Sequence, residues 1–311
     1  MTHPVDQMQI NFSDGNMVIL KIILALIMLG VSLDIRKEDL ENIVKNPKSM
    51  LAGLVAQFFF LPAMTFLLVY FFKPIPSIGL GMMLVAACPG GNISNLITMF
   101  ARGNTALSVS LTFLATVLAL VMTPFNITFW GNMYAPTAKL VQQVALDPKE
   151  VALTVIFVLG IPLLVGMILR AKLPKIATKL QGWLKYLSAL FLAILILGAF
   201  FANFDNFIKY FDYIVGIVIL HNLVALGSGF LMGTVLKVPY RDRRSITIEV
   251  GIQNSGLGLA LAFEFFGGLG GVTLICAFWG LWHAVSGSIL AYVFSKIDKK
   301  RQMTHGAAVN V

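Results

Sequence analysis

The chain has 311 residues and a formal net charge of +9, with only 12% charged residues and 58% hydrophobic residues. A soluble domain carries about a quarter of its residues charged, so this composition excludes an ordinary soluble protein. It also argues against a nucleic-acid partner, because the basic residues stand in short loops between apolar runs and form no basic patch in a soluble segment.

Nine apolar segments along the chain are long enough to cross a bilayer. They are expected to be helices, because lipid offers no partner to an unpaired backbone N–H or C=O group. The sequence therefore predicts an all-α polytopic membrane protein in which residues 1–311 form a single transmembrane domain. The expected spans are residues 16–33, 49–72, 78–100, 106–129, 150–170, 183–203, 213–236, 245–266 and 271–295. The longest polar stretch between spans, about 130–149, is expected on the outer face, and the tail from Lys296 is expected to be disordered.

The loops on one side of the predicted spans hold most of the 23 Lys and Arg residues. Cytoplasmic loops carry this excess, so the N-terminus is expected outside and the C-terminus in the cytoplasm, in the cell (inner) membrane. The first residues include Asp6 and Asp14 and lack the basic start of a cleavable signal peptide. The first span is therefore expected to remain as an anchor.

Two of the predicted spans are interrupted by helix-breaking residues. The third reads LVAACPGGNISNLITMF and the eighth reads SITIEVGIQNSGLGLALAF, so each places glycines beside polar side chains at mid-membrane depth. Non-helical backbone is tolerated there only where it is buried in protein or lines a cavity. Two such segments, one in each half of the chain, predict the paired broken helices of an inverted repeat in a secondary transporter. With nine spans, one half has four and the other five.

Glu249 stands near the middle of the eighth span. A charged carboxylate at the bilayer centre costs about 2.5–3.5 kcal/mol even on the more lenient scale. It therefore needs a bound cation, a proton or a buried partner. The open readings are a cation ligand, a proton relay, or a protonated glutamate that is hydrogen-bonded to a neighbouring helix.

Oxygen-bearing side chains accompany Glu249 in the predicted spans. Ser108 and Thr112 lie four residues apart and therefore on one helix face, although single hydroxyls in helices often bond back to their own backbone. The set holds no sulfur and no imidazole, which favours a hard cation such as Na⁺ over zinc or copper. Its members are Gln57, Ser94, Asn95, Ser108, Thr112 and Gln253.

His221 and His283 also fall inside predicted spans. A single histidine there is more often a packing residue than a ligand, but the small neighbours of His283 in GLWHAVSG make it a candidate for lining a substrate path. Cys88 and Cys276 lie in apolar runs and are interpreted as small buried hydrophobes. The sequence has no P-loop, HExxH or GxSxG motif, and no enzymatic activity is expected.

Three segments, CPGGNISNLITMFARGNTALSVSLT, VAQFFFLPA and EVGIQNSGL, resemble the bile acid:sodium symporter family of the apical sodium-dependent bile acid transporter type. The resemblance runs through all nine spans in order. It implies a small panel domain beside a larger core domain in which the two broken helices cross. The chain resembles the nine-helix members, which lack the first helix of the ten-helix members, and this accounts for the unequal halves.

The resemblance also implies two sodium sites that share Glu249. One would consist of Ser94, Asn95, Ser108, Thr112 and Glu249. The other would consist of Gln57, Glu249, Gln253 and the backbone of Val250 and Ile252. Asn254, Asn92 and His283 match positions near the substrate cavity, and Asn92 departs from members that have threonine there.

The expected function is sodium-coupled symport of an organic anion by alternating access, with two Na⁺ ions as co-substrates and membrane lipid as the surroundings. Two Na⁺ ions against Glu249 leave about one positive charge, and exposed half-helix N-termini add positive dipole ends, so both favour an anionic substrate. The alternatives are a proton-coupled organic anion transporter or exporter with Glu249 as the relay, and a non-transporting receptor or channel. The sequence does not select among bile acids, steroid conjugates and smaller carboxylates, and it leaves the oligomeric state open.

Overall fold

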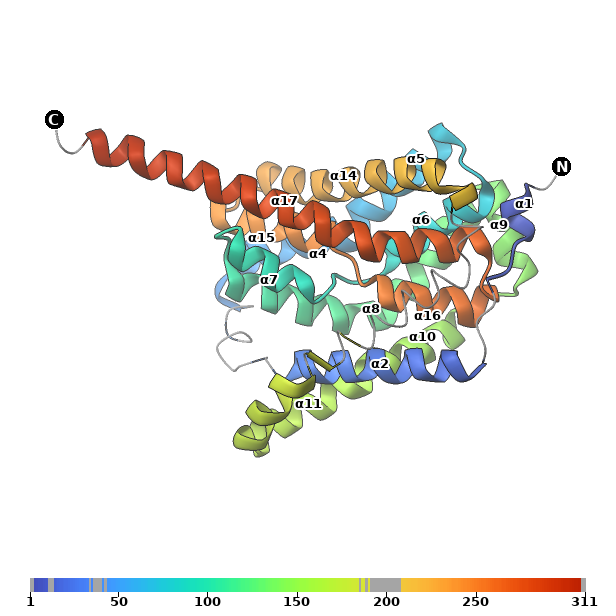
Figure 1. Ribbon diagram of the computed structural model, residues 1–311, viewed down its shortest axis with the longest axis horizontal. Coiled ribbons are helices and arrows are strands. Elements are labelled where there is room, and N and C mark those ends of the chain that lie inside the picture. The colour runs from blue at the N-terminus through green and yellow to red at the C-terminus, as the bar shows by residue number, and fades with distance from the viewer. Residues whose placement is uncertain are drawn as a thin grey trace.

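In a computed structural model the chain is a bundle of α-helices (Figure 1). The structure describes residues 3–10, 14–33, 35, 41, 44–184, 186–187, 190 and 208–308. Within these residues, five helical runs are long and apolar enough to cross a membrane, by length and composition. They are Pro47–Phe72, Thr105–Met133, Pro148–Lys172, Phe211–Val235 and Gly270–Ile297. This architecture fits the predicted all-α polytopic membrane protein.

Two of these runs are composite rods with a π-helical turn inside. One consists of α4 (Pro47–Val55), η1 (Ala56–Phe60) and α5 (Leu61–Phe72), and the other of α10 (Pro148–Val155), η2 (Ile156–Gly160) and α11 (Ile161–Lys172). The uninterrupted helices are α2 (Asp14–Ser32), α8 (Thr105–Met133), α9 (Ala135–Gln143), α14 (Phe211–Val235) and α17 (Gly270–Ala308). Along the lower edge of Figure 1, α2 lies against α11, while α17 and α14 lie together in the upper part of the bundle.

Pro62 accounts for a hydrogen bond between the first rod and α8. Pro62 follows η1 and lacks the N–H that the carbonyl of Phe58 would receive in a regular helix. Asn126 of α8 donates its Nδ2 to that carbonyl at 3.0 Å, and its Oδ1 accepts the indole N–H of Trp130 at 3.1 Å. A side chain from α8 thus replaces a lost backbone hydrogen bond next to Gln57, which lies in η1.

The two interrupted spans are broken at the predicted places. The first consists of α6 (Pro76–Ala87) and α7 (Ile93–Phe100), and the second of α15 (Tyr240–Gly251) and α16 (Ser255–Phe266). Residues 88–92 and 252–254 are the non-helical breaks. Proline and glycines end α6, and α16 restarts with Asn254, whose Oδ1 accepts the N–H of Leu257 at 3.0 Å as a helix N-cap.

The two breaks are hydrogen-bonded to each other. The N–H of Gly91 donates to the carbonyl of Ile252 at 2.6 Å, and the N–H of Asn254 donates to the carbonyl of Pro89 at 2.8 Å. Between them, Gly90 and Gln253 form an antiparallel bridge. Each break therefore satisfies backbone groups of the other, as non-helical backbone at membrane depth requires.

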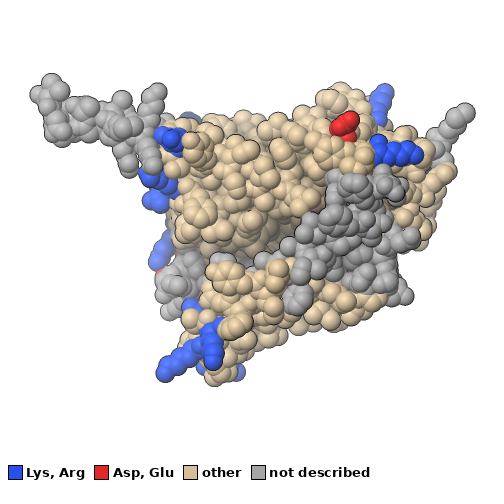
Figure 2. All heavy atoms as spheres, viewed as in Figure 1, with Lys and Arg blue, Asp and Glu red and all other residues tan. Residues whose placement is uncertain are grey.

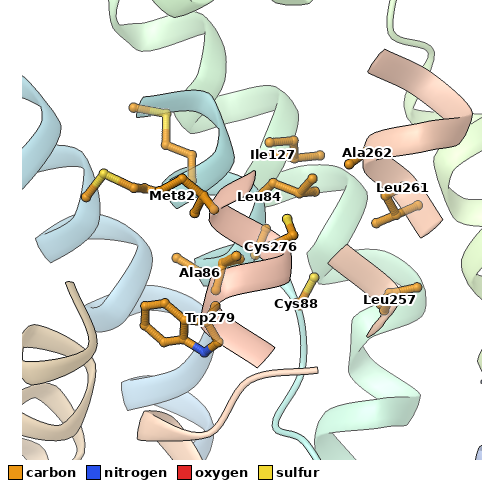
Figure 3. Packing of buried hydrophobic residues seen from close by; sticks show 14 of the residues in the cluster. Met82, Leu84, Ala86, Cys88, Ile127, Leu257, Leu261, Ala262, Cys276 and Trp279 are labelled. Atoms are coloured by element: carbon orange, nitrogen blue, oxygen red, sulfur yellow. The ribbon is translucent and has the colours of Figure 1, made fainter. Parts of the chain in front are cut away.

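Buried hydrophobic residues of α6, α16 and α17 pack against one another in the main core cluster (Figure 3). Leu84, Leu257 and Trp279 meet there with both cysteines, which are free and buried as predicted. A Cβ atom on Gly81 would lie 2.9 Å from the Cα of Val272, so this glycine allows α6 and α17 to approach at backbone distance.

The first residues of the chain form a structured segment on the same bundle. The N–H of Gly270 donates to the carbonyl of Met8 at 2.7 Å, and the N–H of Ile10 donates to the carbonyl of Gly268 at 2.8 Å. Asp6, in the short helix α1 (Pro4–Gln7), accepts the N–H of Ser77 in the first turn of α6 at 2.8 Å. A negative side chain at this position also suits the N-terminal end of the α6 dipole.

The structure shows helices in the polar stretch between spans and in the tail, and the second of these corrects an expectation. The stretch 130–149 contains the helix α9, which Pro136 starts and Thr137 anchors by donating to the carbonyl of Gly131 at 2.8 Å. The tail from Lys296 was predicted to be disordered, which is wrong, because α17 continues to Ala308. The sequence from 296 to 303 consists of residues compatible with a helix and has no Pro or Gly to stop it. Most of the predicted span 183–203 lies outside the described residues.

On the face shown in Figure 2, charged and apolar side chains occupy different regions. Lys and Arg gather where α11 ends and α15 begins, at the left of Figure 2, and a smaller group lies at the opposite end. The described surface between these ends is uncharged. Large apolar side chains of the long helices are exposed, among them Val121 at 69%, Phe157 at 63% and Leu164 at 60%. An exposed apolar belt between two charged ends is the surface that helices in a bilayer present to lipid.

Candidate functional site

Glu249 is the centre of a buried cluster of oxygens. It lies near the end of α15 and is 2% exposed. Its Oε2 accepts hydrogen bonds from the hydroxyls of Ser94 at 2.6 Å and Ser108 at 3.2 Å, and its Oε1 accepts one from Thr112 at 2.7 Å. In the part of the chain that the structure describes, no Lys, Arg or His forms an ion pair with this carboxylate.

The break in the first interrupted span makes room for that carboxylate. Gly90 has no Cβ, and a Cβ at this position would overlap the Glu249 carboxylate. The restart of the helix at Ile93 puts Ser94 in the first turn of α7, while Ser108 and Thr112 come from one face of α8. The consecutive helices α7 and α8 therefore converge on a charged group that is at least 137 residues away from their contacting side chains in the sequence.

Asn95 joins the cluster at its edge. Its Oδ1 accepts a hydrogen bond from the Thr112 hydroxyl at 3.3 Å, and the same hydroxyl also reaches the carbonyl of Ser108 at 3.0 Å. All five residues predicted for the first sodium site are thus linked by direct contacts.

Gln57 and Gln253 form a pair on the other side of the breaks. Both are 1% exposed, and each amide donates to the oxygen of the other, at 2.9 Å and 3.2 Å. Gln57 also donates to the carbonyl of Cys88 at 2.8 Å, and Gln253 to the carbonyl of Val250 at 2.7 Å. The Nε2 atom of Gln253 consequently lies between two oxygens of the second predicted site, those of Gln57 and Val250.

The other backbone group predicted for that site has a second role. The carbonyl of Ile252 accepts the N–H of Gly91 at 2.6 Å and so helps to pair the breaks. A carbonyl oxygen has two lone pairs, and this hydrogen bond uses one of them.

Two of the three residues predicted to lie near a substrate cavity lie beside α2. Asn92 donates its Nδ2 to the sulfur of Met28 in α2 at 3.9 Å. Asn254 caps α16 beside Gly256, whose position faces Leu24 of α2. Both asparagines are partly exposed and lie where the broken helices meet α2.

His283 is placed between Gly280 and Gly287, whose positions face Ser255 and Ile252 at the second break. It lies on α17, is 7% exposed, and its Nδ1 has no hydrogen-bond partner among the described residues. No hydrogen bond in this part of the chain links it to Asn92 or Asn254. His221 is also buried and is hydrogen-bonded through Nε2 to the Thr65 hydroxyl at 2.8 Å, which fits a packing residue.

Sequence reasoning missed two polar residues that hold the ends of the broken helices. Thr123 of α8 donates to the carbonyl of Ala87 at 2.7 Å, at the end of α6. Asn222 of α14 donates to the carbonyl of Gly251 at 2.8 Å, at the end of α15. A polar side chain in an otherwise apolar span was the available signal, because a fully buried asparagine needs a partner.

The donor set of the cluster consists of hard oxygens. It combines one carboxylate with hydroxyl, amide and backbone oxygens. Among the described residues there is no group of three or more His, Cys, Asp or Glu side chains able to hold a metal ion. Oxygen donors with a single negative charge suit an alkali cation better than zinc or copper.

Fold and cluster together define a class: a multi-pass helical membrane protein in which two interrupted helices meet beside a buried, oxygen-lined carboxylate. Residues 21–210 match the Sodium Bile acid symporter family. The chain belongs to this family, so the resemblance seen in the sequence is confirmed. It is a family of transporters and not of enzymes.

Several relatives of the chain are named as sodium-dependent transporters or sodium cotransporters. The chain is 34% identical to the uncharacterized sodium-dependent transporter YocS of Bacillus subtilis, over 90% of this chain and 84% of the relative. It is 30% identical to the probable sodium/metabolite cotransporter BASS1, chloroplastic, of Arabidopsis thaliana, over 89% and 67%. It is 30% identical to the sodium/bile acid cotransporter 4 of Mus musculus, over 76% of this chain and 54% of the relative.

Proposed function

We propose that the protein is a sodium-coupled symporter that carries an organic anion across the cell membrane by alternating access. The observation that supports this most directly is Glu249, a buried carboxylate with three hydroxyl donors and no cationic side chain paired with it in the described residues. A carboxylate in the membrane interior is retained for a function that needs it. The family and the names of its members agree with sodium as the ion.

The first sodium ion is bound by the Glu249 cluster. Its ligands are Ser94, Asn95, Ser108, Thr112 and Glu249. Hydroxyl hydrogens rotate freely, so each hydroxyl that now donates to the carboxylate is able to turn a lone pair toward a cation instead. The hydrogen-bonded arrangement keeps these oxygens close together without the ion.

The second sodium ion is bound at the glutamine pair. Its ligands are Gln57, Glu249, Gln253 and the carbonyls of Val250 and Ile252. The Gln253 Nε2 atom, a hydrogen-bond donor, already lies between the oxygens of Gln57 and Val250. A cation there satisfies the same two oxygens, with the Gln253 amide turned to offer its own oxygen.

Charge explains why the co-substrate is an anion. Two Na⁺ ions against one carboxylate leave about one uncompensated positive charge, and the N-termini of helices add positive dipole ends of roughly half a charge each. α7 and α16 both begin at the breaks, next to Asn92 and Asn254. An organic anion bound at the boundary with α2 and sodium ions in the cluster therefore stabilise each other, which couples their transport.

The driving force suits active uptake. A tenfold sodium gradient supplies ~1.4 kcal/mol per ion, and one net charge moving through 100 mV supplies ~2.3 kcal/mol. With two Na⁺ ions and a monoanion the total of about 5 kcal/mol supports an accumulation on the order of 10³–10⁴-fold.

The two domains and the orientation follow from the same proposal. We assign α2 with the rod of α10, η2 and α11 to the panel, and the broken helices with α8, α14 and α17 to the core. The symmetric exchange of hydrogen bonds between the breaks supports an inverted repeat. The Lys and Arg at the end where α11 stops and α15 starts support a cytoplasmic location for that end and for the C-terminus.

Uptake into proteoliposomes tests the proposal. A labelled conjugated bile acid and a small carboxylate such as pyruvate are offered with an inward Na⁺ gradient and with choline at the same pH. We expect sodium-dependent uptake of an organic anion by the wild-type protein and none by Glu249→Ala. Glu150→Ala is the matched control, because Glu150 is an exposed glutamate in the first turn of α10.

The outcomes separate the ion from its cargo. Sodium-dependent uptake that survives in Glu249→Ala would refute the role of the cluster. Stabilisation of the purified protein by Na⁺ without uptake of either compound would retain the ion sites and reject these substrates. Uptake driven equally in choline, and changed only by a pH gradient, would replace sodium by protons with Glu249 as relay.

A further inference from the structure

The hydrogen bonds between the two breaks define which residues are equivalent in the two halves. The exchange is symmetric, since Gly91 N–H binds the Ile252 carbonyl and Asn254 N–H binds the Pro89 carbonyl. Pro89 therefore corresponds to Ile252, and Gly91 to Asn254. One residue earlier in each break, Cys88 corresponds to Gly251.

At each of these two equivalent positions, a side-chain amide donates a hydrogen bond to the backbone carbonyl. The carbonyl of Cys88 accepts the Nε2 of Gln57 at 2.8 Å, and the carbonyl of Gly251 accepts the Nδ2 of Asn222 at 2.8 Å. Each amide comes from a long helix that packs beside a broken one, the rod of α4, η1 and α5 for Gln57 and α14 for Asn222. Gln57 belongs to the proposed sodium site, whereas Asn222 does not.

Asn222 is placed to control the end of α15. The last carbonyls of a helix have no partner within it, and a glycine there restricts rotation of the backbone less than any other residue. A Cβ on Gly251 would overlap the side chain of Leu226, so α14 packs directly on this glycine and brings Asn222 within reach. Asn222 is fully buried, and in the described residues its only partnered polar atom is the Nδ2 that holds Gly251.

The carbonyl that Asn222 holds lies between two proposed ligands. The Gly251 oxygen belongs to the peptide group between Gly251 and Ile252, and the Val250 and Ile252 oxygens belong to the peptide groups before and after it. Because the middle peptide group is planar, holding its oxygen also positions the two Cα atoms from which the Val250 and Ile252 carbonyl groups continue. Without the Asn222 amide, this peptide group keeps only the hydrogen bond from its Ile252 N–H to the Ile248 carbonyl at 3.0 Å, so its orientation at the glycine, and with it that of the two ligand oxygens, is less restricted.

We propose that Asn222 is a positioning residue for the second sodium site, which it acts on through the Gly251 carbonyl without touching the ion. The inference rests on the proposed function, because it presupposes that the Val250 and Ile252 carbonyls bind Na⁺. It assigns the α14 helix a part in ion binding that corresponds to the part of Gln57 in the other half of the chain.

The test is the sodium dependence of thermal unfolding of the purified full-length protein, titrated with NaCl against choline chloride at constant ionic strength. Asn222→Leu keeps the side-chain size and removes the donor. We expect the Na⁺ concentration for half of the maximal stabilisation to rise about tenfold, the effect of losing one buried hydrogen bond. Asn222→Ser is the second variant, which shows the same rise if Asn222→Leu does not fold.

Two further variants serve as controls for this measurement. Thr65→Val removes the hydrogen bond to His221, the residue next to Asn222 on α14, and is expected to lower the unfolding temperature without Na⁺ while leaving the half-saturating concentration unchanged. Glu249→Gln is expected to abolish the response to Na⁺. If Glu249→Gln loses the response while both Asn222 variants titrate like the wild type, the positioning role is wrong and the sodium site stands. If Glu249→Gln still responds, the proposed function itself fails, and this inference fails with it.

Discussion

At Glu249, three hydroxyls reach one carboxylate, yet a serine or threonine in a helix often serves only its own backbone. α8 contains both kinds within two turns. Thr112 donates to Glu249 at 2.7 Å, whereas Thr116 donates to the carbonyl of Thr112 at 2.7 Å. Both are buried. Because their acceptors differ, comparing the two residues shows how much a hydroxyl in the cluster contributes to sodium binding.

Thr112→Val is expected to weaken sodium binding by roughly tenfold or more, because the swap keeps the shape and removes a ligand that also forms a hydrogen bond to a charged group, worth about 1.5–3 kcal/mol. Thr116→Val is expected to leave sodium binding within about twofold of the wild type, since a hydroxyl that bonds back to its own helix contributes little to stability. Isothermal titration or sodium-dependent unfolding of the purified protein measures both. Equal losses in the two variants would show that the hydroxyl of Thr112 has no special role.

Among individual residues, the members of the oxygen cluster could be chosen from the sequence because a carboxylate and amides in apolar spans are costly and need partners. Asn222 and Thr123 could not, because their significance depends on which backbone carbonyls they face. That His283 lines a substrate path stays a prediction; in the described residues its Nδ1 has no hydrogen-bond partner.

At the scale of elements, the rod of α4, η1 and α5 shows how a local irregularity becomes a contact between helices. Pro62 removes a backbone donor, and Asn126 of α8 supplies one. The π-helical turn and the proline both lie beside Gln57, so the register of this rod determines where a proposed sodium ligand points.

Asn126→Leu is expected to destabilise the protein by about 1–3 kcal/mol, because it removes a buried side-chain donor from the Phe58 carbonyl. The double variant Asn126→Leu/Pro62→Ala is expected to regain part of that loss, since alanine restores a backbone N–H to the helix. The measurement is a double-mutant cycle of thermal unfolding, with Pro62→Ala as the single control. Strictly additive effects would contradict the coupling between the proline and the asparagine.

The broken helices were correctly predicted as elements, because Pro and Gly beside polar residues mark them in the sequence. The continuation of α17 to Ala308 was not, because a short basic segment was interpreted as a disordered tail, and no element was predicted where α9 lies. A segment with no helix breaker can extend a helix that packing has already nucleated, since adding one residue costs far less than starting a helix.

For the whole molecule, the contact between α2 and α16 is the one that transport should change. Lys21 of α2 and Glu264 of α16 form an ion pair of 2.6 Å, with side chains 34% and 28% exposed. A partly exposed pair of this kind contributes only about 0–1 kcal/mol, so motion of α2 relative to the broken helices is able to separate it. The pair thus marks a place where the proposed panel and core touch in this conformation.

A short thiol crosslinker between Lys21→Cys and Glu264→Cys is expected to abolish sodium-driven uptake, because alternating access requires the two layers to move. The background carries alanine at Cys88 and Cys276, and each single cysteine variant is the control for modification alone. Uptake in proteoliposomes is compared before and after a cleavable linker is cut, which is expected to restore it. Full uptake with the linker intact would mean that α2 and α16 move together.

The sequence by itself determined that the chain is a helical membrane protein, where two of its helices break, which carboxylate is buried in the membrane and which family it belongs to. These features are local: apolar length, helix-breaking residues and polar groups in apolar runs can each be recognised within about 20 residues. The tertiary structure alone decided that the breaks bond to each other, that Asn222 and Thr123 hold their ends, that residues 3–10 attach to the loop before α17, and that Lys21 reaches Glu264. Those contacts join residues far apart in the chain, and they depend on how helices pack in three dimensions, which no local pattern specifies.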